Sequence, residues 1–241
     1  MAAVHETDFF VTEKNWSNGC QWYQSLFDGK RDVKGDVSPN YSKAHCFPGV
    51  PKRIQSTIPN IQLIYLVRDP INRIRSHYIH SYASRIENRS LHDAVTSPPI
   101  KDNHYVKCSA YYWQLQQYLK VFDTSQILVL ESEKLWKNRT DVLKTIYTFI
   151  GVDPAWAENQ PEVHRHKSKD KKRRPRFEKY VQNRYARAIL RRVLPAKWSQ
   201  PEPFSSPVIS SKTRSVLSGH LRDDIEALRK LTGKPFESWT L

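Results

Sequence analysis

One stretch of the chain places an arginine and a serine where they could bind an anion together. Residues 63–67 form an apolar run, Arg68 follows it directly, and Ser76 lies on the segment that continues from it. Ligands of open α/β sheets bind at the carboxyl ends of strands, and a helix N-terminus favours negative charge. The guanidinium of Arg68 and the hydroxyl of Ser76 would then bind the same anion. The alternative is that Arg68 pairs with a surface carboxylate and Ser76 only faces a neighbouring side chain.

The net charge of the chain also indicates an anionic partner. The sequence has 39 Lys and Arg against 24 Asp and Glu, a balance of +15, and residues 163–197 alone hold 14 basic and 2 acidic residues, a balance of +12. Nucleic acid, a membrane surface, and a phosphorylated or sulfated small molecule all fit such a charge. Residues 164–176 are too highly charged to pack and are predicted to form a loop.

Alternating strands and helices must position these groups. The β-prone runs are residues 33–37, 61–67 and 126–130, and the helical patterns are residues 70–85, 107–122 and 139–150. Asp69 is expected to cap the first of these helices, and Gly151 to end the last. A basic helix at 178–193, a Pro/Ser-rich connection at 195–207 and a helix at 212–231 follow. The pattern predicts an α/β fold with a mostly parallel, doubly wound sheet.

Length and composition exclude several classes of protein. With 241 residues and 39% hydrophobic residues, the chain can build a core and is not expected to be disordered. No stretch approaches the ~18 consecutive apolar residues of a membrane-spanning helix, and the first residues lack a signal-peptide pattern. Cys20, Cys46 and Cys108 form no CxxC pair, so neither a disulfide framework nor a bound metal is expected. The sequence therefore favours a soluble protein in a reducing compartment.

Several motifs resemble one enzyme family. Residues 63–78 resemble the 3′-phosphate-binding motif of sulfotransferases that use 3′-phosphoadenosine 5′-phosphosulfate (PAPS). Residues 6–10 and 19–23 are similar to the Glu-x-x-Phe-Phe and Gly-x-x-Trp-Tyr segments of heparan-sulfate-type and bacterial members, and residues 35–41 resemble their Glu-x-[Ser/Thr]-Pro-x-Tyr turn. Further matches in the family's order are at 118–131, 166–169 and 221–233. The resemblance covers nearly the whole chain and implies a P-loop-NTPase-like parallel sheet flanked by helices.

The resemblance also implies roles for individual residues. The family's 3′-phosphate contacts fall on Arg68 and Ser76, and its general base falls on Glu6, with His80 as the alternative base. A carboxylate within reach of the acceptor proton suits sulfuryl transfer to a hydroxyl or amine. The lid over the cofactor phosphates, residues 163–176, contains further implied contacts, which are Lys167, Ser168, Lys169 and Arg174. The alternatives are a frayed carboxylate at Glu6, an exposed helix histidine at His80, and a solvated charge run in the lid.

Two features depart from the family's pattern. Asp36 replaces the family's usual Glu, and Val37 stands where heparan-type members have a substrate-contacting lysine, which argues against a heparan-like acceptor. The family's first strand and its Lys-x-Gly-[Ser/Thr]-[Ser/Thr] loop, which binds the 5′-phosphosulfate, have no match here. All seven glycines lie after Glu6, whereas that loop should precede it. The expectation is therefore a single domain, residues 1–241, that lacks this strand and loop and has a helical C-terminal part at 178–241.

The function expected from the sequence is transfer of a sulfuryl group from PAPS, without a metal, to a glycan or small molecule. One alternative is a truncated, catalytically impaired homologue. Another is a basic anion- or nucleic-acid-binding protein, although no nucleic-acid motif accompanies the basic run and no nucleic-acid partner is expected. A cytoplasmic location is expected, or the Golgi lumen if an upstream anchor has been removed. The sequence leaves the oligomeric state open.

Overall fold

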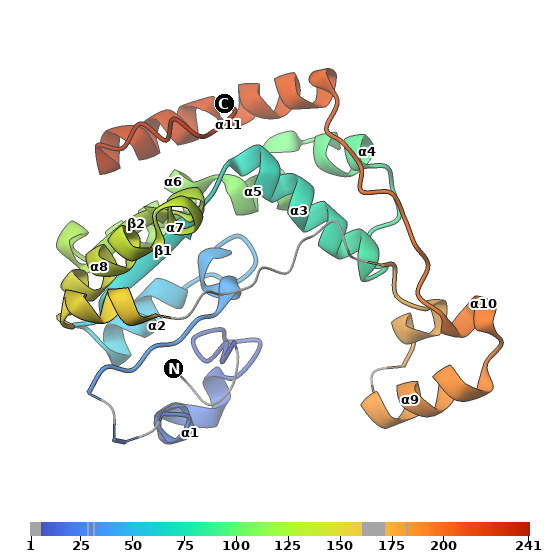
Figure 1. The fold of residues 1–241 in the computed structure, drawn as a ribbon, viewed down its shortest axis with the longest axis horizontal. Helices are drawn as coiled ribbons and strands as arrows, with labels where there is room; N and C mark the ends of the chain where they lie inside the picture. The colour runs from blue at the N-terminus through green and yellow to red at the C-terminus, as the bar shows by residue number, and fades with distance from the viewer. Residues whose placement is uncertain (1–5, 28, 31, 161–171, 182) are drawn as a thin grey trace. The chain divides into compact units, whose positions relative to one another are not determined.

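The computed structural model describes residues 6–27, 29–30, 32–160, 172–181 and 183–241 (Figure 1). They fall into two compact units, and each is described by itself. Unit 1 consists of Met1–Arg68, Ala110–Pro161 and Asp223–Trp239. Unit 2 consists of Asp69–Ser109, Glu162–Arg222 and Thr240–Leu241.

Unit 1 is built on a parallel pair of strands. Strand β1 (Leu63–Val67) pairs with β2 (Ile127–Glu131), with Leu63 opposite Ile127. Figure 1 shows the pair among the helices of this unit. The helices are α1 (Gly19–Ser25), α2 (Val50–Thr57), α6 (Tyr111–Leu119), α7 (Ser132–Lys137) and α8 (Arg139–Phe149), with 3-10 turns at Trp16–Asn18, Pro39–Ser42, Thr124–Gln126 and Pro154–Asn159. The predicted α/β class, a parallel sheet flanked by helices, is confirmed.

The core of unit 1 gathers around the Phe9-Phe10 pair. Both rings are buried, and Phe9 stacks on Tyr23 with ring centroids 4.4 Å apart. The other buried members of this cluster are Val11, Leu26, Val50, Ile54 and Phe122. Because each large apolar side chain contributes about 1.5–3 kcal/mol when fully buried, this cluster fixes the segment that follows Glu6.

The predicted strand at 33–37 is wrong. In the described residues 32–38 the chain forms no regular structure, and both Val33 (47% exposed) and Val37 (54% exposed) face solvent. Between them Asp36 points inward and binds hydroxyl groups. The hydrogen bonds of the Asp36 side chain therefore hold this segment in place, where a strand would be held by backbone hydrogen bonds to a neighbouring strand.

The helix predicted at 107–122 is two helices. Helix α5 (His104–Ser109) ends in unit 2, and α6 begins in unit 1 after Ala110, whose φ and ψ are −79° and 80°. The carboxylate of Asp224 accepts hydrogen bonds from the amides of Tyr112 (2.9 Å) and Trp113 (2.8 Å). Amides at a helix N-terminus lack partners within the helix. Asp224, more than a hundred residues further along the chain, therefore caps the N-terminus of α6 and fixes where this helix begins.

Unit 2 is mainly helical. Helices α4 (Leu91–Thr96) and α5 pack on α3 (Pro70–Ala83). A 3-10 turn at Ile100–Asp102 precedes α5, and the later elements are a turn at Arg176–Lys179, α9 (Arg184–Val193) and α10 (Ala196–Ser199). The long helix α11 (Ser211–Thr232) is confirmed close to its predicted bounds, and it contributes to both units.

In this part of the chain, the structure differs from the sequence prediction in the bounds of two segments. The basic helix predicted at 178–193 begins only at Arg184, because Asn183 caps it by accepting the amides of Tyr185 (2.8 Å) and Ala186 (3.2 Å). The turn before it buries Phe177. Helix α10 lies inside the predicted Pro/Ser-rich connection. At the end of α8, Gly151 has φ +70° and ends the helix as expected.

Candidate functional site

Glu6 lies at the start of a sharply bent segment. Its backbone is left-handed, with φ +60°, and its side chain is exposed. Asp8, two residues later, also has a positive φ, +46°, and the residues from Thr7 to Val11 are buried. An exposed carboxylate on a segment whose neighbours are fixed in the core can meet a substrate without loss of position.

Asp36 holds this segment in place. Its Oδ2 accepts a hydrogen bond from Thr7 Oγ1 (2.6 Å) and another from Tyr41 OH (2.7 Å). Tyr23 OH and Ser38 Oγ, each at 3.3 Å, also donate to this carboxylate. The network ties the first described residues to the turn at Pro39–Ser42 and to α1. We name these five residues, Thr7, Tyr23, Asp36, Ser38 and Tyr41, the Asp36 network.

Burial and the carboxylate together keep the network's phenols protonated. Desolvation, with a smaller contribution from Asp36, raises the pKa of Tyr23 well above its usual range. Desolvation likewise raises the pKa of Tyr41. Both phenols therefore remain hydrogen-bond donors at any physiological pH. Beside them, Asp8 accepts a bond from Asn40 Nδ2 (2.8 Å) through Oδ2, and its buried Oδ1 has no hydrogen-bond partner.

Arg68 leaves the carboxyl end of β1, as predicted. It is half-buried, and its backbone N–H donates to Tyr111 OH at 3.4 Å. Tyr111 is itself buried and packs edge-on against Tyr65 of β1, with ring centroids 5.9 Å apart. The backbone of Arg68 is thus fixed by unit 1 at the end of the strand.

Ser76 and His80 lie on α3 in unit 2, one turn apart and therefore on one face of the helix. Ser76 is half-buried and His80 is exposed. Asp69 orients the start of the helix: it is buried, and it accepts the amide of Asn72 (2.8 Å). It also accepts the amide and the hydroxyl of Thr240, both at 2.7 Å. Asp69 is the predicted cap, and Ser76 lies about two turns beyond it.

Of the predicted lid contacts, the structure describes only Arg174. Lys167, Ser168 and Lys169 lie outside the described residues. The side chain of Arg174 is exposed, and its backbone is attached to the end of α3, because its N–H donates to the carbonyl of Ala83 (2.8 Å) and its carbonyl accepts from Arg85. Arg173 stacks over the ring of Tyr82 at 4.1 Å. The end of the predicted lid is therefore anchored to the helix that carries Ser76.

The sequence from residue 2 to residue 203 matches the family model described as a sulfotransferase domain. The chain belongs to the sulfotransferase family.

Heparan sulfate enzymes are among the relatives of this sulfotransferase domain. It is 25% identical to the bifunctional heparan sulfate N-deacetylase/N-sulfotransferase 4 of Mus musculus over 95% of this chain and 26% of that protein. It is 24% identical to the heparan sulfate glucosamine 3-O-sulfotransferase 5 of Homo sapiens over 63% of this chain and 46% of that protein. The chain thus spans between a quarter and a half of the length of these curated relatives.

A solved structure shares the fold of the sulfotransferase domain. The crystal structure of a sulfotransferase from Alicyclobacillus acidocaldarius superposes with a TM-score of 0.68 at 18% identity. The match covers 100% of this chain and 87% of that one. This likeness supports the P-loop-like α/β fold expected from the sequence.

A group of side chains suited to a metal, which the sequence pattern did not predict, lies in unit 2. His77 on α3 and His104 and Cys108 on α5 present ligand atoms within 4.8 Å of one another, and Cys108 Sγ is 3.8 Å from His104 Nε2. Imidazole and thiolate together suit Zn²⁺ and other transition metals. The spacing of four between His104 and Cys108 was the available signal, but only the packing of α3 on α5 adds His77.

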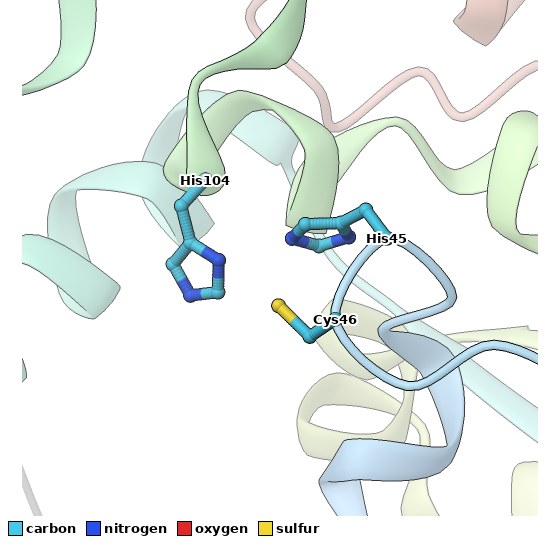
Figure 2. A group of neighbouring side chains, drawn as sticks. All are labelled: His45, Cys46 and His104. Atoms are coloured by element: carbon cyan, nitrogen blue, oxygen red, sulfur yellow. The ribbon is translucent and has the colours of Figure 1, made fainter.

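A second histidine–cysteine pair lies in unit 1. His45 and Cys46 are consecutive residues of the loop before α2, and Figure 2 draws them together with His104. Nδ1 of His45 is 3.3 Å from Nε2 of Gln114, and its ring lies 6.3 Å from that of Trp113. Cys46 is exposed, but partial desolvation raises the pKa of its thiol, so less of it is present as the reactive thiolate at neutral pH.

Proposed function

We propose that this protein transfers a sulfuryl group from PAPS to a hydroxyl or amine of a glycan or small-molecule acceptor. The observation that carries the proposal is the match of residues 2–203 to the sulfotransferase family. The order of residues along the chain supports it, because Arg68 directly follows β1 and Ser76 lies on the next helix, and a cation and a hydroxyl are donors that a nucleotide phosphate requires.

The described donors fit the cofactor chemically. Arg68 offers a planar fork of N–H donors and Ser76 a hydroxyl, and neither side chain is fully buried. Under this proposal both bind the 3′-phosphate, and Lys167, Ser168, Lys169 and Arg174 contact the nucleotide from the lid. When bound, PAPS supplies the activated sulfuryl group.

Glu6 accepts the proton of the acceptor under this proposal. The acceptor's oxygen or nitrogen forms the new bond to sulfur while the bond from sulfur to the phosphate oxygen breaks, and the proton passes to the Glu6 carboxylate. The Asp36 network positions Glu6 through Thr7, the next residue along the chain. His80 is the alternative base, and it is exposed on the face of α3 that also carries Ser76.

The proposed acceptor class rests on the names of the relatives and on Val37, which differs from the lysine of heparan-type members. Two relatives are named for heparan sulfate, which favours a glycan. Val37 is 54% exposed where heparan-type members have a lysine, so this position offers an apolar group in place of a cation. We therefore propose a glycan with little negative charge, or a small alcohol or amine, over heparan sulfate itself.

Calorimetry with 3′-phosphoadenosine 5′-phosphate tests the cofactor site. The double variant Arg68→Ala/Ser76→Ala should weaken binding by at least about a hundredfold, because it removes charge-assisted bonds to phosphate. The matched control is Arg222→Ala/Ser56→Ala, which removes the same groups at exposed positions on α11 and α2. The cofactor assignment fails if wild type and the Arg68/Ser76 variant bind equally at millimolar ligand.

A sulfuryl-transfer assay tests the base. Glu6→Gln should lower kcat by about 10²- to 10⁴-fold with nucleotide affinity unchanged, and His80→Asn should lower it less than tenfold. A larger loss with His80→Asn would move the role of base to His80. Offering desulfated glycan, sulfated glycan and a simple phenol in parallel decides among the acceptor classes.

A further inference from the structure

Helix α9 is amphipathic and leaves one apolar stripe open to solvent. Its sequence is Arg-Tyr-Ala-Arg-Ala-Ile-Leu-Arg-Arg-Val. Tyr185, Ile189 and Val193 follow one another at intervals of four and therefore share a face. Their exposed fractions are 67%, 62% and 74%. We name these three residues the α9 stripe.

The other side of α9 is basic. At about 100° per residue, Arg187 and Arg191 fall on the arc opposite the α9 stripe, and Arg192 lies at the edge of the stripe, beside Tyr185 in projection. Arg187 donates to the carbonyl of Val181, and Arg191 Nε donates to Glu178 Oε1 at 2.9 Å. The bounds of α9 contain no acidic residue. The helix therefore presents an apolar face beside a positively charged one.

Two further aromatic side chains are exposed near α9. Tyr180 precedes the helix and is 79% exposed, and Trp198 on α10 is 50% exposed. Tyr and Trp side chains have an apolar body and a polar tip, so they are favoured at the boundary between water and lipid. They add amphipathic surface to the same stretch of chain.

We propose that α9 binds the surface of an anionic phospholipid membrane, lying in the plane of the headgroups with the α9 stripe inserted. A strongly amphipathic helix with arginines on its polar face and aromatic and aliphatic residues on the other is the pattern of interfacial helices. Arg192, at the edge of the α9 stripe, complements the charge of anionic headgroups, whereas Arg191 is already paired with Glu178. Among the described residues no helix is long and apolar enough to cross a bilayer, so such binding would be peripheral.

Two other occupants fit the helix less well. A sulfated glycan would satisfy the arginines, but it offers nothing apolar to the α9 stripe. A second copy of this chain would cover the stripe, but it would bring its own arginines close to those of the first copy. Only a lipid surface satisfies both faces at once.

Co-sedimentation of the full chain with vesicles tests the proposal. We expect binding to phosphatidylcholine vesicles that contain phosphatidylserine and none to phosphatidylcholine alone. Ile189→Asp/Val193→Asp should lower the partition constant at least about tenfold, because it removes the inserting side chains. Val193→Trp, which strengthens an interfacial contact, should raise the constant several-fold.

Matched variants show how much of the vesicle binding comes from insertion of apolar side chains and how much from positive charge. Val208→Asp changes an apolar side chain that is 83% exposed but lies outside α9, and it should leave binding within about twofold. Arg192→Glu should lower the constant about tenfold, whereas Lys212→Glu, an exposed residue at the start of α11, should change it little. Circular dichroism and thermal unfolding confirm that each variant is folded.

Three results would overturn the proposal. The first is failure of the wild-type protein to bind the anionic vesicles. The second is binding that Ile189→Asp/Val193→Asp leaves intact and soluble heparin abolishes, which would make α9 a polyanion site. The third is self-association of the wild type, but not of the stripe variant, in sedimentation velocity, which would assign the stripe to a second copy.

Discussion

Two hydrogen-bonded carboxylates, the half-buried Asp36 in unit 1 and the buried Glu87 in unit 2, differ in the charge of their partners. Asp36 in unit 1 accepts hydrogen bonds from neutral hydroxyls, the shortest from Thr7 at 2.6 Å and Tyr41 at 2.7 Å. Glu87 in unit 2 accepts from the guanidinium of Arg89, 2.7 Å from Nη2, and from the amide of Asn88 at 2.9 Å. Asp36 joins distant segments through neutral hydroxyls, whereas Glu87 is bound mainly within a turn of three residues, with one further bond from Tyr105 OH at 3.3 Å.

The difference lies in what each carboxylate controls. The hydrogen bond from Arg89, with further bonds from the amides of Arg89 and Asn88, lowers the pKa of Glu87 to about 2 in spite of its burial. Glu87 thus couples the stability of unit 2 to pH. The partners of Asp36 carry no charge, so removing this carboxylate should release the segment that bears Glu6 at any pH near neutrality.

The largest expected effect is that of Asp36→Ala. This change removes the acceptor shared by four hydroxyls. Thr7 and Tyr41 can still bond each other, but the buried Tyr23 loses its acceptor, and the change should lower the free energy of unfolding by about 3 kcal/mol. Because Thr7 adjoins Glu6, kcat for sulfuryl transfer should fall more than the nucleotide affinity. Urea unfolding and the transfer assay measure the two effects.

Asp32→Ala is the control for Asp36→Ala. Asp32 lies four residues earlier and is exposed, so its loss should change stability by less than about 0.5 kcal/mol. If the two variants unfold at the same urea concentration, the Asp36 network does not hold the segment.

Glu87→Gln should have the next largest effect, and that effect should depend on pH. A lowered carboxyl pKa stabilises the fold fully above the unfolded value of about 4.5, and the contribution disappears as pH falls toward about 2. Near pH 7 the variant should be about 2 kcal/mol less stable, a figure reduced for solvent screening because the Arg89 side chain is 53% exposed. Urea unfolding between pH 2 and 7 should show the two curves converging in acid; a constant difference would contradict the coupling.

The smallest effects should rank the donors of the Asp36 network. Tyr41→Phe removes a hydroxyl 2.7 Å from Asp36 and should lower the free energy of unfolding by about 1 kcal/mol. Tyr23→Phe removes a hydroxyl 3.3 Å from Asp36 and should lower the free energy of unfolding by about half as much. Thermal unfolding of both variants gives the order, and a reversed order would show that distance does not determine the strength of these bonds.

The sequence was informative where local patterns decide the structure. The apolar runs predicted β1 and β2, Asp69 and Pro70 predicted the start of α3, and Gly151 predicted the end of α8. These signals act over a few residues. The positions of Arg68 at a strand end and of Ser76 on the helix after it were predicted in the same way, and their roles stay a prediction.

The rest depended on partners far along the chain. Residues 33–37 have two valines and looked like a strand, but Asp36 bonds Thr7, 29 residues earlier, and the strand does not form. The helix at 107–122 breaks because Asp224 supplies its carboxylate from α11. No window of sequence contains both members of such a pair. The α9 stripe was hidden for another reason, since periodicity shows an apolar face but not whether another element covers it.

The dependence of α6 on Asp224 has a consequence for synthesis. A chain leaving the ribosome presents residues 111–119 long before residue 224 exists, so the first amides of α6 are without the partner that they have in the finished fold. Burial, moreover, raises the pKa of Asp224. Unit 1 can therefore complete α6 only after residue 224 has been made, whereas α3 to α5, contiguous in sequence, can pack on one another earlier.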